Sequence, residues 1–480
     1  MIPASLLIIL IPLVAAAPAY VLRRWRTLEV LCAVIACGLV IVILTRPTDT
    51  VLTIGSFSIN TLAPVNLLGR VLAVRPTDHQ PLVLLFAVAL FLFLLGWSVS
   101  QGWSFIPLGL GILSLLSTAL LIRPFVFSAL AFEAVAALGA IMIQADRNSE
   151  HEVTGALRYL VISTLALPAF LGAGYAVAQA GGITDPALQA GAYAPAVTLL
   201  GIGLALLFGA LPLFTWTHAV ANDAPPLTTA FLATVGIGAV TFLFLSLKQD
   251  FAWFRDGADI RTIANLLGIA TLLFGGVLGW AQRSFSRVIA CGLSVEIGCT
   301  LLLLNSNTAL SVEAIAFGIA ARALSLGVAG LGITLLREQV GQDDFALIGG
   351  LGRQHKAAAL AIAVGGLSLA GLPGTVGFVT RWVTARVLGQ TDLEILVLTI
   401  LAGASIGIGV IRGLSALFAQ PAFTPADTGE PSQAPRASGE TRRVALIILI
   451  GVALVIALGV APGLTSPVTR AIADNYTFYR

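Results

Sequence analysis

The sequence predicts an all-α polytopic membrane protein with about fourteen transmembrane helices. Of its 480 residues, 58% are hydrophobic and only 10% are charged, and the mean hydropathy is +0.98. Soluble domains are roughly half apolar and a quarter charged. Runs of roughly 20 apolar residues, long enough to cross about 30 Å of hydrocarbon as a helix, recur along the chain. These runs are residues 2–22, 28–46, 80–98, 102–122, 124–145, 155–180, 192–218, 226–247, 262–281, 285–305, 309–335, 357–384, 391–411 and 443–463.

The first region, residues 1–79, is expected to hold two helices followed by an extracytoplasmic hairpin and an amphipathic segment. Arginines follow the first apolar run instead of preceding it, so we expect a retained helix and not a signal peptide. Residues 47–79 contain short alternating stretches such as VLTIGSFSI, which favour the hairpin. A third helix is expected within residues 80–101.

Two later spans are longer than a perpendicular crossing needs, and each contains an internal proline, Pro212 or Pro373. Proline removes a backbone hydrogen bond and breaks or kinks a helix, so the seventh and twelfth helices are predicted to be broken. The two breaks are five spans apart, which indicates two five-helix repeats, residues 102–250 and 260–415. An odd number of helices per repeat requires that the two be inverted relative to each other.

The C-terminal region is expected to contain a flexible cytoplasmic loop at residues 416–442, rich in Pro, Ser, Gly and Ala, and then a final helix within residues 443–480. Basic residues concentrate in one alternate set of loops, which the positive-inside rule places in the cytoplasm. Both termini then face outward, and the expected location is a prokaryotic inner membrane. The net charge of +3 reflects this loop bias and indicates no nucleic-acid partner.

The four cysteines lie inside apolar spans without CxxC spacing, so we interpret them as small buried residues. No pattern for a phosphate loop, a nucleophile triad or a metal cluster is present in the sequence. We therefore expect that this chain binds no cofactor of its own.

Four ionisable residues lie near the middle of apolar spans: Glu133 in the fifth, Glu296 in the tenth, Arg322 in the eleventh and Arg381 after the break in the twelfth. Each costs roughly 2.5–3.5 kcal/mol to insert at the bilayer centre, so such residues usually have a function. Their spread over both expected repeats favours a pathway for charge. The alternative is that they form structural ion pairs between helices.

His218 and Asp223 lie at the predicted cytoplasmic end of the seventh span, in LFTWTHAVANDAPP. They are candidates for gating proton entry. A polar helix end is the simpler explanation, and we favour it.

Several stretches together resemble a known family in order and spacing: ALRYLVISTLALPAFLGAG, LPLFTWTHAVANDAPPLTTAFLAT, AQRSFSRVIACGLSVEIG and SLAGLPGTVGFVTRW. They are similar to signature regions of the antiporter-like membrane subunits of respiratory complex I (NADH:quinone oxidoreductase), related hydrogenases and multi-subunit cation/proton antiporters. The resemblance covers roughly residues 80–415. It is greatest to the subunit lettered N, followed by the subunit lettered M.

The resemblance implies a hydrated proton path formed by a glutamate on the fifth helix and by lysines or histidines on later helices. Glu133 matches the fifth-helix glutamate. The other matching positions have lost the expected groups: Leu207 and Phe214 on the seventh span, Ile237 or Ala239 on the eighth, Arg322 in place of a histidine, Leu326 in place of a lysine, and Arg381 in place of the twelfth-helix lysine. The chain's two lysines, Lys248 and Lys356, lie at span ends. Because arginine keeps its proton at nearly any pH, we expect an impaired lysine pathway.

The leading hypothesis is an antiporter-like, proton-translocating or degenerate membrane subunit of a complex I-type NADH:quinone oxidoreductase, without its own redox centre, that couples quinone redox chemistry to proton transfer. Its expected partners are other membrane subunits and the lipid bilayer. One alternative is a subunit of a cation/proton antiporter or ion-coupled uptake complex without redox chemistry. A third is a non-conducting scaffold subunit of the membrane arm.

Overall fold

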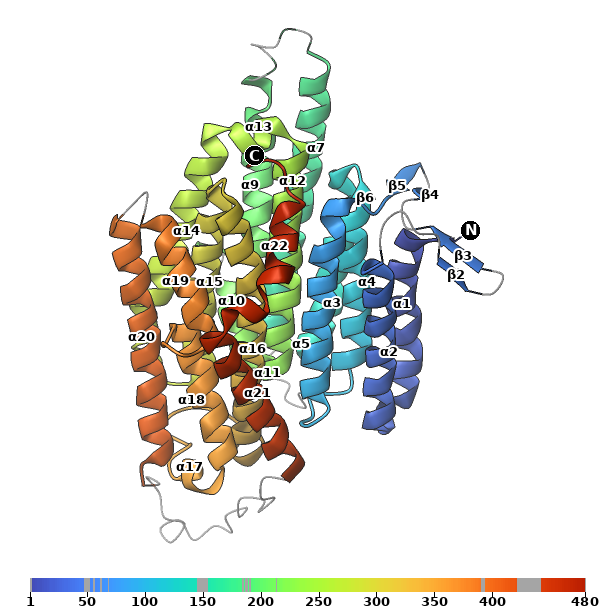
Figure 1. The fold of residues 1–480 in the computed structure, drawn as a ribbon. Helices are drawn as coiled ribbons and strands as arrows, with labels where there is room; N and C mark the ends of the chain where they lie inside the picture. The colour runs from blue at the N-terminus through green and yellow to red at the C-terminus, as the bar shows by residue number, and fades with distance from the viewer. Residues whose placement is uncertain are drawn as a thin grey trace.

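The computed structural model describes residues 2–46, 52–54, 57–60, 63–67, 69–144, 154–183, 185, 189, 191–212, 214–389, 393–420 and 442–479. In this part of the chain, eleven helices are long and apolar enough to cross a membrane. Three shorter apolar helices, Phe105–Leu121, Ala194–Phe208 and Lys356–Ala370, accompany them. The helices stand side by side in one elongated bundle (Figure 1). The predicted all-α polytopic membrane fold is therefore confirmed.

The helices follow one another along the whole chain. The first half contains α1 (Ala4–Val21), η1 (Leu22–Arg24), α2 (Arg26–Leu44), α3 (Pro76–Gly96), α4 (Phe105–Leu121), η2 (Phe125–Phe127), α5 (Ser128–Gln144), α6 (Thr154–Thr164), α7 (Ala166–Gly181), α9 (Ala194–Phe208), α10 (Thr215–Asp223), α11 (Pro226–Phe231), the π-helix η3 (Leu232–Gly236) and α12 (Ile237–Asp250). The second half contains α13 (Ala252–Asp256), α14 (Ala258–Gly279), α15 (Phe285–Asn305), α16 (Ala309–Val340), α17 (Leu351–Gln354), α18 (Lys356–Ala370), α19 (Val376–Leu388), α20 (Leu393–Phe418), α21 (Arg442–Val460), η4 (Pro462–Leu464) and α22 (Ser466–Asp474).

Two small sheets lie at one end of the bundle, beside α1 and α4 (Figure 1). One has the order β1-β3-β2, and the other has the order β4-β5-β6. The strands are β1 (Ile2–Pro3), β2 (Leu52–Ile54), β3 (Phe57–Asn60), β4 (Val65–Leu67), β5 (Arg70–Leu72) and β6 (Ile122–Arg123). The β2–β3 and β4–β5 pairs are antiparallel, with Thr53 opposite Ser58 and Asn66 opposite Val71. The strands β2, β3, β4 and β5 lie within residues 47–79, the segment in which a hairpin was expected.

The third helix begins at Pro76, four residues before the expected position. Proline at the first helical position leaves no backbone donor to be satisfied. The Asp78 carboxylate also accepts a hydrogen bond from the Arg75 backbone N–H at 3.1 Å, which completes a capping interaction. Most of the cytoplasmic loop expected at 416–442, namely residues 421–441, lies outside the described residues.

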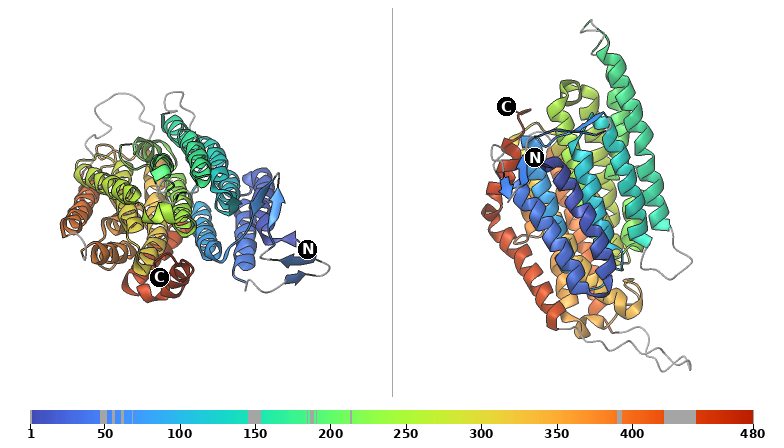
Figure 2. Two further views of the ribbon diagram at one scale, coloured as in Figure 1. Left: turned by 90° about the horizontal axis from the view of Figure 1, so that it is seen from above. Right: turned by 90° about the vertical axis from the view of Figure 1, so that its right-hand side faces the viewer.

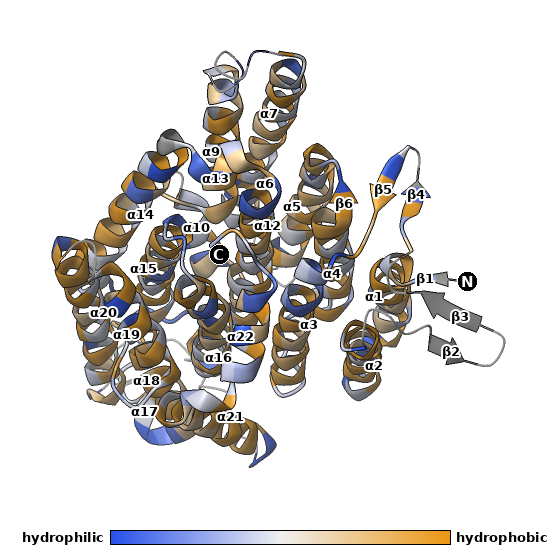
Figure 3. Cartoon of the chain, turned by 45° about the horizontal axis from the view of Figure 1, so that its top comes forward, coloured by the Kyte–Doolittle hydropathy of each residue, from blue (hydrophilic) through white to orange (hydrophobic). Residues whose placement is uncertain are grey.

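Three spans form the centre of the bundle. In the apolar 18-residue window of each of the spans 226–250, 285–305 and 309–340, the buried share is 94%, compared with 22% in the span that contains α1. Seen from above, α1 and α2 (blue) lie at one end of the elongated cross-section and α20 (orange) lies at the other (Figure 2). Hydrophobic residues cover the lengths of the helices, and hydrophilic ones gather at their ends (Figure 3). Glu296 on α15 and Arg322 on α16 are accordingly buried inside the bundle, with exposed fractions of 5% and 2%.

Both predicted helix breaks are present. Residues 209–214 separate α9 from α10, and residues 371–375 separate α18 from α19. At the second break Gly371 has φ +85°, a conformation that favours glycine. The hydroxyl of Ser368 accepts a hydrogen bond from the Gly377 backbone N–H at 3.1 Å, so a side chain satisfies part of the freed backbone. The relation of the two five-helix groups as inverted repeats stays a prediction.

The C-terminal helices cross the bundle surface and tie its halves together. α21 runs obliquely over the bundle (Figure 1) and contacts α16, α18 and α19. α22 then packs on α16 and α3. The N and C labels lie toward the same end of the bundle (Figure 1). The side of the membrane on which this end lies stays a prediction.

Candidate functional site

A buried ion pair joins α15 to α19 at the second helix break. Arg381 Nη2 lies 3.0 Å from Glu296 Oε1, and the two side chains are only 9% and 7% exposed. Arg381 also donates to Cys299 Sγ at 3.0 Å and to the Leu369 carbonyl oxygen at 3.2 Å. Leu369 is in the last turn of α18. The guanidinium of Arg381, which belongs to α19, therefore links the second half of the broken helix to its first half and to the central helix α15.

Arg322 on α16 is a second buried guanidinium close to this pair. It donates to Thr300 Oγ1 at 3.0 Å, and Thr300 in turn donates to the Glu296 backbone oxygen at 2.8 Å. It also donates to the Ala233 carbonyl oxygen at 3.2 Å, within the π-helix η3. A π-helical turn replaces the usual i→i+4 bonds with longer ones and is frequent at functional sites. Arg322 therefore connects the cluster to the expected first repeat.

The cluster has more positive than negative charge. Two guanidinium groups face one carboxylate, and among the described residues no carboxylate lies within 4.0 Å of Arg322. The Nε atoms of Arg322 and Arg381 are buried and have no hydrogen-bond partner in the described chain. Since arginine does not release its proton, both positive charges are permanent. Among these contacting groups, Glu296 and Cys299 can exchange protons.

Glu133 is not part of this cluster. Its Oε1 accepts a hydrogen bond from Thr164 Oγ1 at 2.9 Å, at the end of α6. Its Oε2 is buried without a hydrogen-bond partner in the part of the chain that the structure describes. Of the predicted site residues, Glu296, Arg322 and Arg381 are thus brought together, while Glu133 lies apart in α5.

The positions at which the resemblance places lysines in the first repeat also meet in space. Leu207 of α9 and Ile237 of α12 line one cavity of about 30 Å³, together with Tyr159, Ser163 and Trp216. A cavity of this size can hold about one water molecule. Apolar side chains therefore occupy the place of the expected proton carriers.

His218 on α10 is surrounded mainly by aromatic rings. The centroids of Phe214 and Phe274 lie 5.2 Å and 5.9 Å from its ring, and the Cys291 Sγ is 3.6 Å from its Nε2. The aromatic neighbours provide no charge partner for a protonated imidazole.

Asp223, at the end of α10, accepts a hydrogen bond from the Gly155 backbone N–H at 2.8 Å. Gly155 lies in the first turn of α6, where backbone donors have no partner within the helix. This contact gives Asp223 a capping role, in agreement with the simpler interpretation of a polar helix end. A role in proton entry stays a prediction.

A second polar cluster, which sequence reasoning missed, ties the end of α16 to the start of α15. Arg337 Nε lies 3.0 Å from Asp343 Oδ1, and Arg337 Nη2 donates to Ser286 Oγ at 2.7 Å. The other Asp343 oxygen accepts from the Ser286 backbone N–H at 2.6 Å, so it caps α15. Arg337 also donates to the Ala224 carbonyl oxygen at 3.0 Å, which links the α10–α11 turn to the same cluster.

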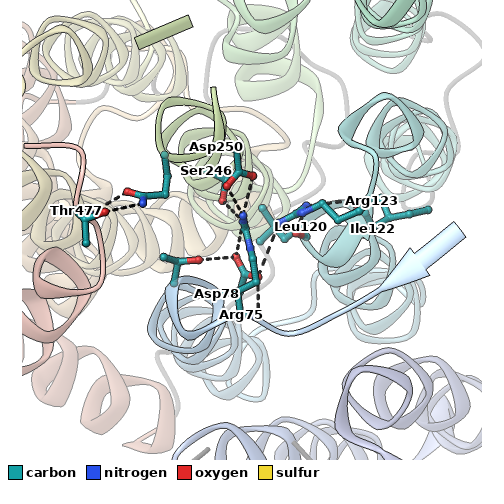
Figure 4. A network of polar contacts seen from close by, with 10 residues as sticks. Arg75, Asp78, Leu120, Ile122, Arg123, Ser246, Asp250 and Thr477 are labelled. Carbon is teal, nitrogen blue, oxygen red and sulfur yellow. Dashed lines mark hydrogen bonds and ion pairs between the residues drawn. The ribbon is translucent and has the colours of Figure 1, made fainter. Parts of the chain in front are cut away.

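A third network joins the start of α3 to α12 (Figure 4). Arg75 donates to both carboxylates beside it, reaching Asp250 Oδ2 at 2.7 Å and Asp78 Oδ2 at 3.2 Å, and it reaches Ser246 Oγ at 3.1 Å. Burial lowers the pKa of Arg75, but Asp78 and Asp250 outweigh that effect and raise it overall. Burial, and then the nearby Arg75, lower the pKa of Arg123. The network fastens α3 to α12, and the contacts of Arg75 with Ser246 and Asp250 join residues too far apart in sequence for a local signal to reveal them.

In the described residues, no group of three His, Cys, Asp or Glu side chains is arranged to hold a metal ion. The expectation that the chain binds no cofactor stays a prediction.

Comparison with known proteins identifies the family. The profile of the family described as NADH:quinone oxidoreductase/Mrp antiporter, TM, matches residues 126–407. The chain is 26% identical over 348 residues to NADH-quinone oxidoreductase subunit N of Alkalilimnicola ehrlichii, covering 70% of this chain and 69% of that protein. It is 27% identical over 339 residues to subunit N of Halorhodospira halophila, covering 67% and 68%.

Solved structures share the fold at low sequence identity. A chain of the Mrp complex from a Dietzia species superposes with a TM-score of 0.75 at 17% identity, covering 98% of this chain and 97% of that one. A chain of respiratory complex I from Thermus thermophilus gives a TM-score of 0.71 at 18% identity, covering 98% and 100%. The chain belongs to the NADH:quinone oxidoreductase/Mrp antiporter transmembrane family, as an antiporter-type membrane subunit similar to subunit N.

Proposed function

We propose that this chain is a proton-translocating membrane subunit of an NADH:quinone oxidoreductase-type complex and that its second repeat carries the proton step. The observation that carries the proposal is the buried Glu296–Arg381 pair at the broken α18–α19 helix. Discontinuous helices free backbone polar groups in the membrane interior, where ion paths are found. The redox chemistry takes place in other subunits, and this chain contributes fixed charges and an exchangeable carboxylate.

The chemistry assigns different roles to the two partners. The Glu296 carboxylate can accept a proton and release it, whereas Arg381 can only attract, repel or orient. When a proton binds Glu296, the ion pair loses its attraction and Arg381 faces a neutral acid. A charge change in a neighbouring subunit can drive the same opening and closing electrostatically. Arg381 therefore acts as a fixed charge that sets when Glu296 is protonated.

The first repeat is proposed to be non-conducting. Leu207 and Ile237 replace groups that would carry a proton between Glu133 and the central cluster. A single water in the small cavity they line does not form a continuous chain. In this proposal, only the first repeat has lost proton conduction. If Glu296 also exchanges no proton, the entire chain is a non-conducting scaffold.

A second candidate is a subunit of a cation/proton antiporter or ion-coupled uptake complex that performs no redox chemistry. The fold likeness to a chain of an Mrp complex favours it. Both candidates imply other membrane subunits and the lipid bilayer as partners, and both imply a prokaryotic inner membrane with the termini outside.

Affinity purification from native membranes in a mild detergent, followed by identification of every copurifying subunit, tests the choice. Iron–sulfur and quinone-site subunits are expected. If only small membrane subunits or a soluble partner without redox centres copurify, the redox-driven proposal is wrong and the second candidate replaces it.

Proton transfer is tested in the purified complex by comparing Glu296→Gln with Glu133→Gln. We expect that Glu296→Gln lowers the number of protons moved per turnover and that Glu133→Gln leaves it unchanged. Loss in the Glu133 variant alone would contradict the assignment to the second repeat. An unchanged ratio in both variants would identify a scaffold.

A further inference from the structure

A long groove runs along the outer side of the second helix break, between α19 and α20. Its volume is about 690 Å³, and apolar side chains and glycines form nearly all of its wall. Trp382 and Ile400 line it and are 61% and 60% exposed. Gly371 and Pro373, the residues of the break, also line the groove. α20 lies at the outer edge of the bundle (Figures 2 and 3), so the groove opens toward the surroundings of the bundle.

Two arginines of α19 line this groove and differ in direction. Arg381 turns its guanidinium inward to Glu296 and contributes to the wall from its place beside Gly371. Arg386 is exposed, lies in the last turn of α19, and has no partner among the described residues. At 1.5 Å per residue it stands about 7.5 Å farther along the helix than Arg381. An exposed cation at a helix end, one turn beyond Trp382, is typical of the membrane interface.

We propose that this groove binds an anionic phospholipid, with the phosphate on Arg386 and one acyl chain lying between α19 and α20 as far as the break. The apolar wall suits a hydrocarbon chain, and the exposed guanidinium of Arg386 suits a negatively charged headgroup. A zwitterionic lipid can fill the same volume, but it gains less from the positive charge. A helix of a neighbouring subunit would leave Arg386 without a counter-charge unless it supplied one.

The bound chain has a consequence for the central ion pair. It covers Gly371 and Pro373 from the bilayer side and so keeps water away from the Leu369 carbonyl oxygen that Arg381 contacts. Glu296 then exchanges its proton only through the protein interior. This role holds for a redox-driven complex and for an antiporter, so it does not depend on which complex the chain joins.

The test uses the purified complex in nanodiscs of phosphatidylcholine containing a small fraction of phosphatidylglycerol with a photoactivatable acyl chain. After illumination, labelled peptides of α19 and α20 are quantified by mass spectrometry, and the matched photoactivatable phosphatidylcholine is the reference. We expect labelling by the anionic lipid to exceed that by phosphatidylcholine. Arg386→Gln should reduce the preference about fivefold, the factor that corresponds to about 1 kcal/mol per basic residue at a charged membrane surface.

Arg386→Lys should keep the preference because it keeps the charge. Arg158→Gln, which removes an exposed arginine of α6, should also leave it unchanged. Equal labelling by both lipids in the unaltered complex would overturn the proposal, as would a preference that survives Arg386→Gln.

A second pair of variants tests the groove without altering charge. Ala404→Phe fills the groove from α20 and should lower labelling by both lipids, whereas Leu401→Phe, outside the groove on the same helix, should not. Equal effects of the two would refute an acyl-chain site. A photo-crosslinking residue at Ile400 in native membranes should capture lipid, and capture of a neighbouring subunit instead would show that a protein occupies the groove.

Discussion

Replacement of Arg381 by methionine tests the fixed-charge interpretation most directly. The change removes the ion pair to Glu296 together with the hydrogen bonds to Cys299 and to the Leu369 carbonyl oxygen. Removal of one partner from a buried pair typically costs about 3–5 kcal/mol, because the other charge stays buried without compensation. Arg322 remains near Glu296 and offsets part of this cost. We therefore expect a loss of about 3 kcal/mol, near the lower end of that range.

The assay measures the amount of assembled complex in membranes and its thermal unfolding after purification. Arg381→Lys keeps the charge but lacks the planar fork that reaches several acceptors at once, so an intermediate loss is expected. The double variant Glu296→Gln with Arg381→Met removes both members of the pair. Its loss should be clearly smaller than the sum of the two single losses, because each single change leaves the other residue uncompensated.

Two results would refute this reasoning. If Arg381→Met assembles with unchanged stability, the ion pair does not stabilise the assembled subunit, and the expected loss of about 3 kcal/mol is wrong. If the losses of the two single variants simply add in the double variant, the ion pair contributes no coupling, and the contact at 3.0 Å has no energetic meaning.

Three further predictions concern the rest of the bundle. Glu133→Gln should change the stability of the complex by less than about 1 kcal/mol in thermal unfolding, because the amide oxygen can still accept the existing hydrogen bond; a loss of several kcal/mol would reveal a charge partner. Gly377→Ala would place a Cβ onto the Ser368 carbonyl oxygen and force the halves of the broken helix apart, so the assembled subunit should be largely lost in membrane immunoblots. Gly181→Ala, where nothing lies within 4 Å of the new atom, is the matched control and should assemble normally. Arg337→Met should destabilise the complex by about 3–5 kcal/mol, because its buried carboxylate partner stays behind without the cation, and an unchanged melting temperature would contradict this.

Local sequence predicts the helices well because hydrophobicity and helix length are local properties. The apolar run at 285–305 coincides with α15, and the prolines Pro212 and Pro373 lie within the breaks that interrupt the seventh and twelfth helices. The start of α3 at Pro76 was missed because its apolar run begins later, while the capping contact to Asp78 lies ahead of that run. The π-helix η3 has no local signal, since its residues LATVG suit an ordinary helix equally well.

The pairing of the buried charges could not be predicted in the same way. Glu296, Arg322 and Arg381 each stand out as ionisable residues in apolar spans, yet their contacts join helices that are far apart in the chain. The contact of Arg322 with the Ala233 carbonyl oxygen spans 89 residues and depends on the π-helical turn. The Arg75 network depends on a contact to Asp250 that spans 175 residues. Sequence therefore identifies the members of the site, and the fold decides their partners.

In the function that we propose, the two expected repeats have lost their proton-carrying groups by different routes, with different consequences. In the first, Leu207 and Ile237 line a small cavity, so the proposed path is closed by packing, and Glu133 accepts a hydrogen bond from the Thr164 hydroxyl within the described part of the chain. In the second, Arg322 and Arg381 keep positive charge in place but make it permanent. A permanent charge can still respond to a neighbouring subunit, because it changes the free energy of protonating Glu296 whenever the pair opens or closes. Proton movement in this chain, if confined to the second repeat, must therefore depend on the carboxylate, and arginine must act through its field.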